Sequence, residues 1–195
     1  MEAARSLPPA GLLRSHTCAT IIGLLWVSGL SISEVVHLNT KDVYLEQGLL
    51  HIRQTKFFKS RIVPISKSTV AALDAYKKKK NSLGYSSINT SPFFVNRKAK
   101  RYPTSNIQHT FHDLVVKLNL KTTQGGFPRL HDFRHTFATR WIDDIYKFGK
   151  DPNAYLPILA TYLGHTNIAN TQVYLHISMN LLHNAGERLR KYIKK

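Results

Sequence analysis

The segments of this chain that can form β-strands are confined to one short stretch of the sequence. Three runs there are rich in β-branched and other apolar residues, namely Val43–Tyr44, Leu49–Thr55 and Arg61–Ile65. A tight turn separates the last two runs, which is typical of a hairpin. We therefore predict one small three-stranded antiparallel sheet, so the rest of the fold has to be helical or irregular.

Helical patterns occupy most of the remaining sequence, and capping residues or glycines mark several of their ends. Gly29 ends the first helix, and Ser31 and Glu34 have the spacing of a capping box that starts the second. The predicted helices cover 17–27, 31–38, 66–76, 107–118, 131–145, 155–163, 170–177 and 181–192. The fold class is therefore mainly α (α+β), and a length of 195 residues fits a single domain, 1–195.

The charge balance points to the kind of partner. Lys and Arg outnumber Asp and Glu 28 to 11, which gives a formal net charge of +17 and a pI near 10.1. Self-repulsion of this size costs stability, so we expect a polyanionic partner. Nucleic acid is the first candidate, and an anionic membrane surface is the second.

The single cysteine and one apolar run bear on the compartment. Cys18 is the only cysteine, so no intrachain disulfide can form, and we expect a reducing cytoplasm. The apolar run Ala19–Leu30 follows two arginines and superficially resembles a signal peptide. It is too short to span a bilayer, so we interpret it as a buried helix and expect no membrane partner.

Residues suited to binding a phosphate stand at the start of the predicted helix 131–145. His131 and Arg134 are three residues apart and share a helix face. A helix N-terminus also offers free N–H groups to an anion. An arginine fork beside an imidazole can stabilise a phosphate whose oxygens gain charge during attack.

Three further segments place reactive side chains at turns or on a helix. Gly164 can end a helix in the left-handed conformation and so fix His165 on a turn. Tyr174 lies on the predicted helix 170–177, and a phenol with an ordinary pKa near 10 needs cationic or basic neighbours to act as a nucleophile. Lys56 stands where a strand meets the hairpin turn, where it can protonate a leaving oxygen.

The order of these segments carries a family resemblance. A hairpin lysine, His-x-x-Arg, Leu-Gly-His and a tyrosine nine positions later together resemble the tyrosine recombinase (phage integrase) family. The resemblance runs from about Ala19 to Tyr192 and is most specific in 130–139, 163–165 and 171–176. The segment 28–34 also resembles a family signature.

The resemblance implies a role for each residue. Tyr174 attacks the scissile phosphate and forms a 3′-phosphotyrosyl link, while Arg134 and His131 bind the non-bridging oxygens. His165 donates a further hydrogen bond, and Lys56 protonates the departing 5′ oxygen. The family uses no ATP, cofactor or divalent metal. Its partners are double-stranded DNA and other protomers on DNA, in a tetrameric synapse.

Two departures from the family pattern stand out. The family has an arginine at the position of Ser31, where it is a second clamp on the phosphate. A serine brings no charge and cannot make a bidentate contact, so we expect impaired cleavage. Few residues precede the first predicted helix, and we expect the family's N-terminal DNA-binding domain to be absent from this chain.

Three alternatives remain open. Ser31 also fits a non-catalytic DNA-binding protein derived from a recombinase. A type IB topoisomerase uses similar chemistry, although the Leu-Gly-His and Thr-Gln-Val-Tyr-Leu-His segments resemble recombinases. A metal hydrolase is less favoured, because Asp132 stands where a zinc-protease helix has glutamate between two histidines, here His131 and His135.

Two surface segments are predicted to bind partners. Arg97, Lys98, Lys100 and Arg101 form a basic cluster just ahead of a helix start, and we expect it to contact DNA phosphates. The tail 181–192 has apolar positions at helical spacing, which suits packing either on its own core or on a neighbouring protomer. We expect a monomer in solution that associates on DNA.

Overall fold

The strands of the computed structural model, which describes residues 13–53 and 60–176, pair as the sequence predicts. The sheet has the order β1 (Val43–Tyr44), β2 (Leu49–Ile52) and β3 (Arg61–Pro64), with both pairs antiparallel. Leu50 lies opposite Val63 in the register, and both side chains are buried. Buried and less buried positions alternate along β2, so one side of the sheet faces the core.

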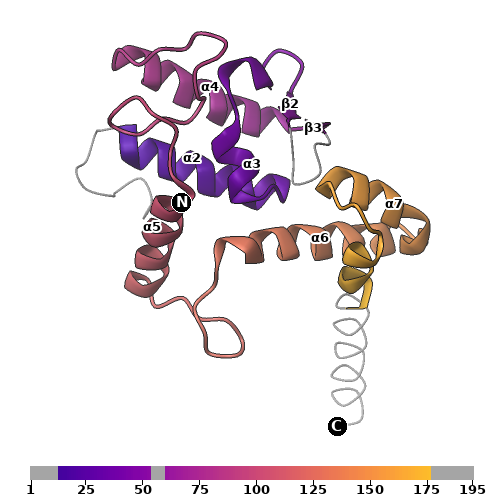
Figure 1. Ribbon diagram of the computed structural model, residues 1–195. Helices are drawn as coiled ribbons and strands as arrows, with labels where there is room; N and C mark the ends of the chain where they lie inside the picture. Colours follow the sequence, from indigo (N-terminus) through magenta and orange to yellow (C-terminus); the bar gives the residue numbers. More distant parts are fainter. Residues whose placement is uncertain (1–12, 54–59, 177–195) are drawn as a thin grey trace. The chain divides into compact units, whose positions relative to one another are not determined.

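The chain divides into two compact units, one ending at Arg134 and the other beginning at His135. In the first unit α2 (Leu13–Ser28) packs against α3 (Ile32–His37) and α4 (Lys67–Ser82), as Figure 1 shows. The short helix η1 (Thr40–Asp42) precedes the sheet, and α5 (Thr104–Lys117) follows the loop after α4.

Local sequence explains how two of these helices end. Gly29, with a φ of 61°, takes the left-handed conformation that stops α2. Helix α4 runs through the lysine run to Ser82, beyond the predicted end near Tyr76, because lysine is a good helix former. Lys80 is fully buried, and its Nζ donates to the carbonyl oxygens of Pro92 and Phe93. Burial lowers the pKa of Lys80 to about 8, with nearby Lys77 adding to the effect.

Helix α6 (Leu130–Lys147) starts in the first unit and continues into the second. The second unit also holds α7 (Pro152–Leu163) and a helical segment from 169 to 176. Asp151 caps the start of α7, and Gly164, with a φ of 75°, ends it. The core of this unit is a cluster of apolar side chains from these three segments: Ala138, Ile142, Leu156, Leu159, Leu163, Tyr174 and Leu175.

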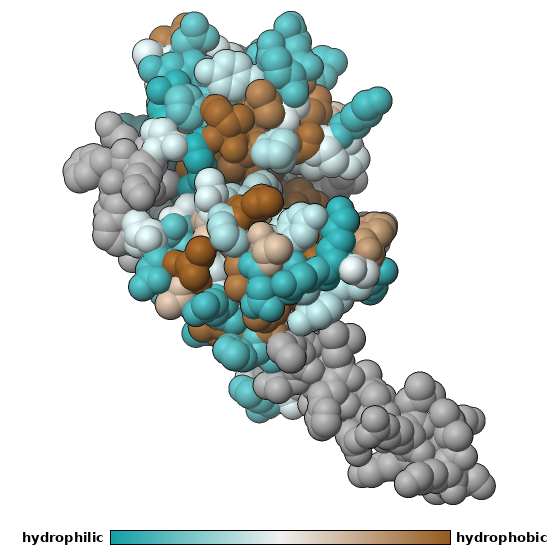
Figure 2. Space-filling model, turned by 90° about the vertical axis from the view of Figure 1, so that its right-hand side faces the viewer, coloured by the Kyte–Doolittle hydropathy of each residue, from teal (hydrophilic) through white to brown (hydrophobic). Residues whose placement is uncertain are grey.

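Hydrophilic residues predominate on the face shown in Figure 2, with hydrophobic residues exposed between them. Over residues 13–53 and 60–176, none of the helices combines the length and hydrophobicity that crossing a lipid bilayer requires. The predicted fold class, mainly helical with one small antiparallel sheet, is confirmed. The predicted helix 181–192 lies outside the described residues, and the single-domain assignment stays a prediction.

Candidate active site

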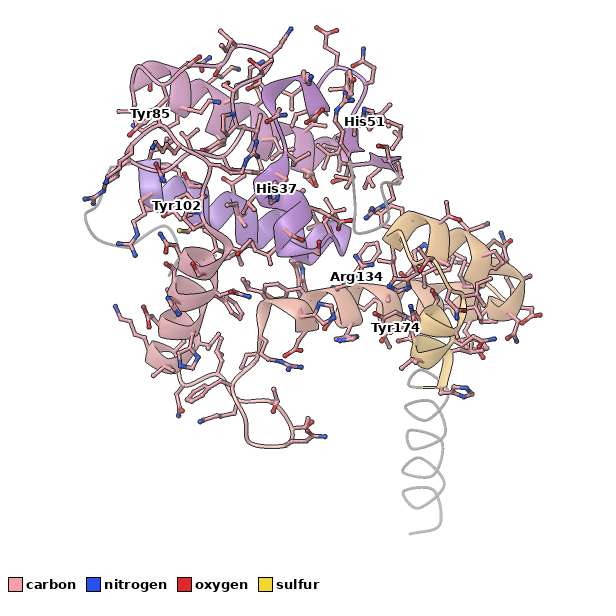
Figure 3. All side chains as sticks on the ribbon, viewed as in Figure 1. His37, His51, Tyr85, Tyr102, Arg134 and Tyr174 are labelled. Atoms are coloured by element: carbon pink, nitrogen blue, oxygen red, sulfur yellow. The ribbon has the colours of Figure 1, made fainter. Side chains whose placement is uncertain are left out.

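Arg134 lies one turn into α6, and its side chain is buried in the first unit (Figure 3). Its Nη1 donates to the carbonyl oxygen of Gly29 at 3.1 Å and lies 3.8 Å from Oε2 of Glu34. Because Gly29 and Glu34 flank the start of α3, these contacts fix the guanidinium beside the segment 28–34. A buried arginine needs such partners, since an isolated buried charge is costly.

Glu34 connects this arginine to the sheet. Its Oε1 accepts a hydrogen bond from Arg61 Nη1 at 2.7 Å, and its Oε2 accepts one from the Ser31 backbone N–H at 2.8 Å. Burial by itself raises the pKa of Glu34, but the hydrogen bond and charge of Arg61, the Ser31 N–H and Arg134 together outweigh it and lower that pKa. Glu34 is therefore an ionised acid between two arginines. The sequence indicated only its capping role, because nothing local predicts a contact with Arg61.

Ser31 is the N-cap of α3, and the capping box with Glu34 is present as predicted. Its hydroxyl accepts from the Glu34 backbone N–H at 3.3 Å. Ser31 also lines a cavity of about 440 Å³, and the wall contributed by the start of α6 includes Arg129 and His131. His131 is exposed. The structure thus places the degenerate arginine position and the predicted phosphate-binding histidine at one cavity.

The second unit holds the other group of predicted site residues. Gly164 ends α7 and puts His165 on the following turn, where its Nδ1 lies 2.8 Å from the Thr171 Oγ1. The His165 ring is stacked on the Tyr174 ring, with centroids 6.3 Å apart and planes at 17°. On α6, His135 has its ring centroid 5.5 Å from that of Tyr174.

Tyr174 is 3% exposed and belongs to the core of its unit (Figure 3). Two imidazole rings therefore lie against the ring of a buried tyrosine. Sequence reasoning did not single out Thr171, and it considered His135 only as a metal ligand. Thr171 stands three residues before Tyr174, so helical spacing could have indicated that both share a face.

Lys56 lies outside the described residues, and its role stays a prediction. In the described part of the chain, no three or more histidine, cysteine, aspartate or glutamate side chains are grouped as metal ligands.

The basic cluster 97–101 is a turn organised by Asn96. The Asn96 Oδ1 accepts hydrogen bonds from the backbone N–H groups of Lys98 and Lys100. Arg97, Lys98 and Lys100 are exposed. Arg101 is half-buried, and its guanidinium donates to backbone carbonyl oxygens at the end of α3 and to an asparagine that follows it. Arg101 thus ties the turn to α3, while the other three side chains extend into solvent.

Comparison with known proteins adds to this geometry. A sequence profile of the phage integrase family matches residues 13–180. The chain belongs to this family.

Relatives within the phage integrase family carry recombinase names. The chain is 39% identical to y4rB of Sinorhizobium fredii, which bears an integrase/recombinase name, over 92% of this chain and 57% of that protein. It is 35% identical to the tyrosine recombinase XerC of Chlamydia trachomatis, over 83% of this chain and 47% of that protein. The chain thus spans about half the length of the curated relatives it matches.

Solved structures show the same fold. The XerA recombinase is 27% identical, with a TM-score of 0.69, over 97% of this chain and 59% of that chain. The XerH recombinase, solved bound to its difH substrate after cleavage, is 20% identical with a TM-score of 0.72, over 95% of this chain and 49% of that chain. At that identity the likeness to XerH shows the fold alone.

Proposed function

We propose that this chain is the catalytic part of a site-specific DNA recombinase that cleaves and rejoins DNA through Tyr174. The observation that carries the proposal is the contact of the Tyr174 ring with the rings of His165 and His135. In a chain of this family, a tyrosine at this motif position next to imidazole groups suits nucleophilic attack on a phosphate.

The proposed step transfers a phosphodiester to the protein. The Tyr174 oxygen bonds to phosphorus, and the bond from phosphorus to the 5′ oxygen breaks. The phenolic proton passes to a neighbouring base, and Lys56 supplies a proton to the departing 5′ oxygen. The 3′-phosphotyrosyl link keeps the bond energy, so the reverse attack by a 5′ hydroxyl rejoins a strand. Because Tyr174 is buried, cleavage requires a movement that exposes its phenol.

Arg134, His131 and His165 are the proposed contacts to the non-bridging oxygens. Charge that develops on a phosphate during attack is stabilised most by donors held in place beforehand. The hydrogen bond of Arg134 to Gly29 and its nearness to Glu34 are such a support. Ser31 leaves the motif without its first arginine, and in other phosphoryl-transfer sites one arginine is worth roughly 10³–10⁵ in rate. We therefore propose that cleavage is slow.

The proposed partners are double-stranded DNA and further protomers in a tetrameric synapse. A net charge of +17 supports a DNA partner, because phosphate contacts dominate the affinity of such proteins. Ser31 also favours a second candidate function, a DNA-binding protein derived from a recombinase that occupies sites without cutting them. Cytoplasmic location stays a prediction.

Covalent trapping tests the proposal. A duplex is first recovered from a random pool by repeated binding, and then given a nick so that the cleaved strand end diffuses away. We expect a covalent protein–DNA adduct, slow with the chain as it is and faster with Ser31→Arg, and none with Tyr174→Phe. A chain that binds the duplex but forms no adduct, even as Ser31→Arg, is the non-catalytic DNA-binding protein.

A further inference from the structure

We infer that Arg129 takes the place of the arginine missing at position 31 and supplies the second positive charge to the bound phosphate. The inference rests on the proposed function, since it names a residue of the same phosphate site. It begins from the cavity of about 440 Å³ beside Ser31.

Arg129 lines this cavity together with Ser31, at the position of the missing arginine, and His131, one of the proposed phosphate contacts. Ser31 lies on the wall formed by the start of α3, whereas Arg129 and His131 lie on the wall formed by the start of α6. Of the described residues that line the cavity, Arg129 is the one with a permanent charge. A serine at position 31 thus lines a cavity whose lining also includes an arginine.

Other arginines that could fill the gap are held elsewhere. Arg53 and Arg61 form ion pairs with Asp42 and Glu34. Arg14 donates to a threonine hydroxyl on α5. None of these three is among the described residues that line the cavity. Among the arginines that the structure describes, Arg129 is the one that lines the cavity.

The backbone of Arg129 is fixed, while its side chain can turn. Its backbone N–H donates to Asp132 Oδ2 at 2.8 Å. This hydrogen bond holds the backbone of Arg129 in place two residues before His131. The Arg129 side chain is 76% exposed, and its Nη2 lies 3.3 Å from Asp132 Oδ1. Exposed pairs of this kind contribute little to stability, so a phosphodiester, which carries one negative charge and gains more during attack, can draw the guanidinium away.

We expect Arg129 to replace the missing arginine only in part. An arginine at position 31 extends from the N-cap of α3, whereas Arg129 extends from the residue just before α6, so the two side chains approach a phosphate from different elements. Transition-state stabilisation depends on donors already in place, and the Arg129 side chain has to leave Asp132 first. Arg129 therefore explains a residual rate of cleavage rather than the rate of the Ser31→Arg variant.

A double-mutant cycle on covalent adduct formation tests the inference, with the nicked duplex recovered from the random pool as substrate. The four proteins are the chain as it is, Arg129→Gln, Ser31→Arg and the double variant. We expect Arg129→Gln to slow adduct formation at least about tenfold in the Ser31 background and to have little effect in the Ser31→Arg background. Lys117→Gln, which removes an exposed charge from the end of α5, is the matched control and should leave the rate unchanged.

Three outcomes overturn the inference and leave the proposed function standing. They are an equal rate with and without Arg129, an equal loss in both backgrounds, and adduct with Ser31→Arg but none with the chain as it is. Adduct from none of these proteins overturns the proposed function as well.

A titration with inorganic phosphate addresses the same cavity without DNA or cleavage. We expect a saturable shift of the His131 imidazole resonances, which Arg129→Gln weakens and Lys117→Gln does not. Phosphate that shifts His131 equally in both variants, or not at all, counts against Arg129 as a phosphate ligand. This measurement stays decisive if Ser31→Arg fails to fold.

Discussion

The Thr171 hydroxyl oxygen lies 2.8 Å from Nδ1 of His165, and this contact fixes the orientation of the imidazole stacked on the Tyr174 ring. Thr171 is fully buried, so its hydroxyl does not bond to bulk water instead. Which nitrogen of a histidine carries the proton depends on the partner of the other nitrogen. Thr171 is thus a positioning residue for the proposed hydrogen bond from His165 to the phosphate.

Thr171→Val should keep the shape of the site and remove this hydrogen bond. We expect adduct formation, measured in the Ser31→Arg background, to slow by roughly 10–100-fold, as for other groups that orient a functional histidine. Affinity for the duplex should stay the same, and Thr171→Ser should restore most of the rate. An unchanged rate with Thr171→Val would mean that the contact only fills space.

Glu34→Gln should destabilise the first unit, because it removes the negative charge that lies next to the largely buried side chains of Arg61 and Arg134. We expect a loss of about 3 kcal/mol in the free energy of unfolding at pH 7, measured with urea. The matched control is Asp74→Asn, which breaks an exposed ion pair with Lys78 and should cost little.

The effect of Glu34 should also depend on pH. Its pKa in the folded protein is below the ordinary value of 4.5, so the folded state binds its proton less readily than the unfolded state does. The stabilisation is therefore complete above that value and is lost as the pH falls through the lower, folded pKa. The difference in unfolding free energy between the chain and Glu34→Gln should shrink below about pH 4.5. A constant difference would contradict the assignment.

Ser31→Arg should lower the free energy of unfolding and raise the rate of cleavage. The Ser31 hydroxyl caps α3, and losing an N-cap typically costs about 1 kcal/mol. We expect the free energy of unfolding, measured with urea or heat, to fall by that amount. Ser31→Ala, which loses the cap and gains no charge, should show the same loss. Faster adduct formation should follow only from Ser31→Arg. A variant as stable as the chain itself would show that the cap contributes nothing.

The exposed part of the basic turn should contribute to DNA binding without regard to sequence. Neutralising Arg97 and Lys100 together should weaken binding to all duplexes alike and reduce the slope of log affinity against log salt by about 2. Neutralising Lys78 and Lys117, which are also exposed, is the control for net charge. An equal effect of both pairs would show that only overall charge matters.

Assembly is expected to require DNA. Light scattering should show a monomer in the absence of DNA and a larger species when the selected duplex is added. A stable tetramer without DNA would contradict this prediction.

The sequence by itself determined the features that depend on neighbours a few residues away. The helix end at Gly29, the left-handed Gly164, the capping box of Ser31 and Glu34, and the three antiparallel strands all appear where they were predicted. Such features need only local sterics and hydrogen bonds. The motif order also identified the family, because the spacing of those segments is itself a property of the sequence.

The tertiary structure alone decided which partners hold the candidate site residues. Glu34 meets Arg61 across 27 residues, Arg134 meets Gly29 across 105, and Arg101 is tied to Val36 across 65. No local rule specifies these pairs, since they arise when packing of the apolar faces brings distant segments together. For the same reason, the cavity lined by Ser31, Arg129 and His131 depends on the tertiary structure, because it forms where α3 and the start of α6 come together in one unit.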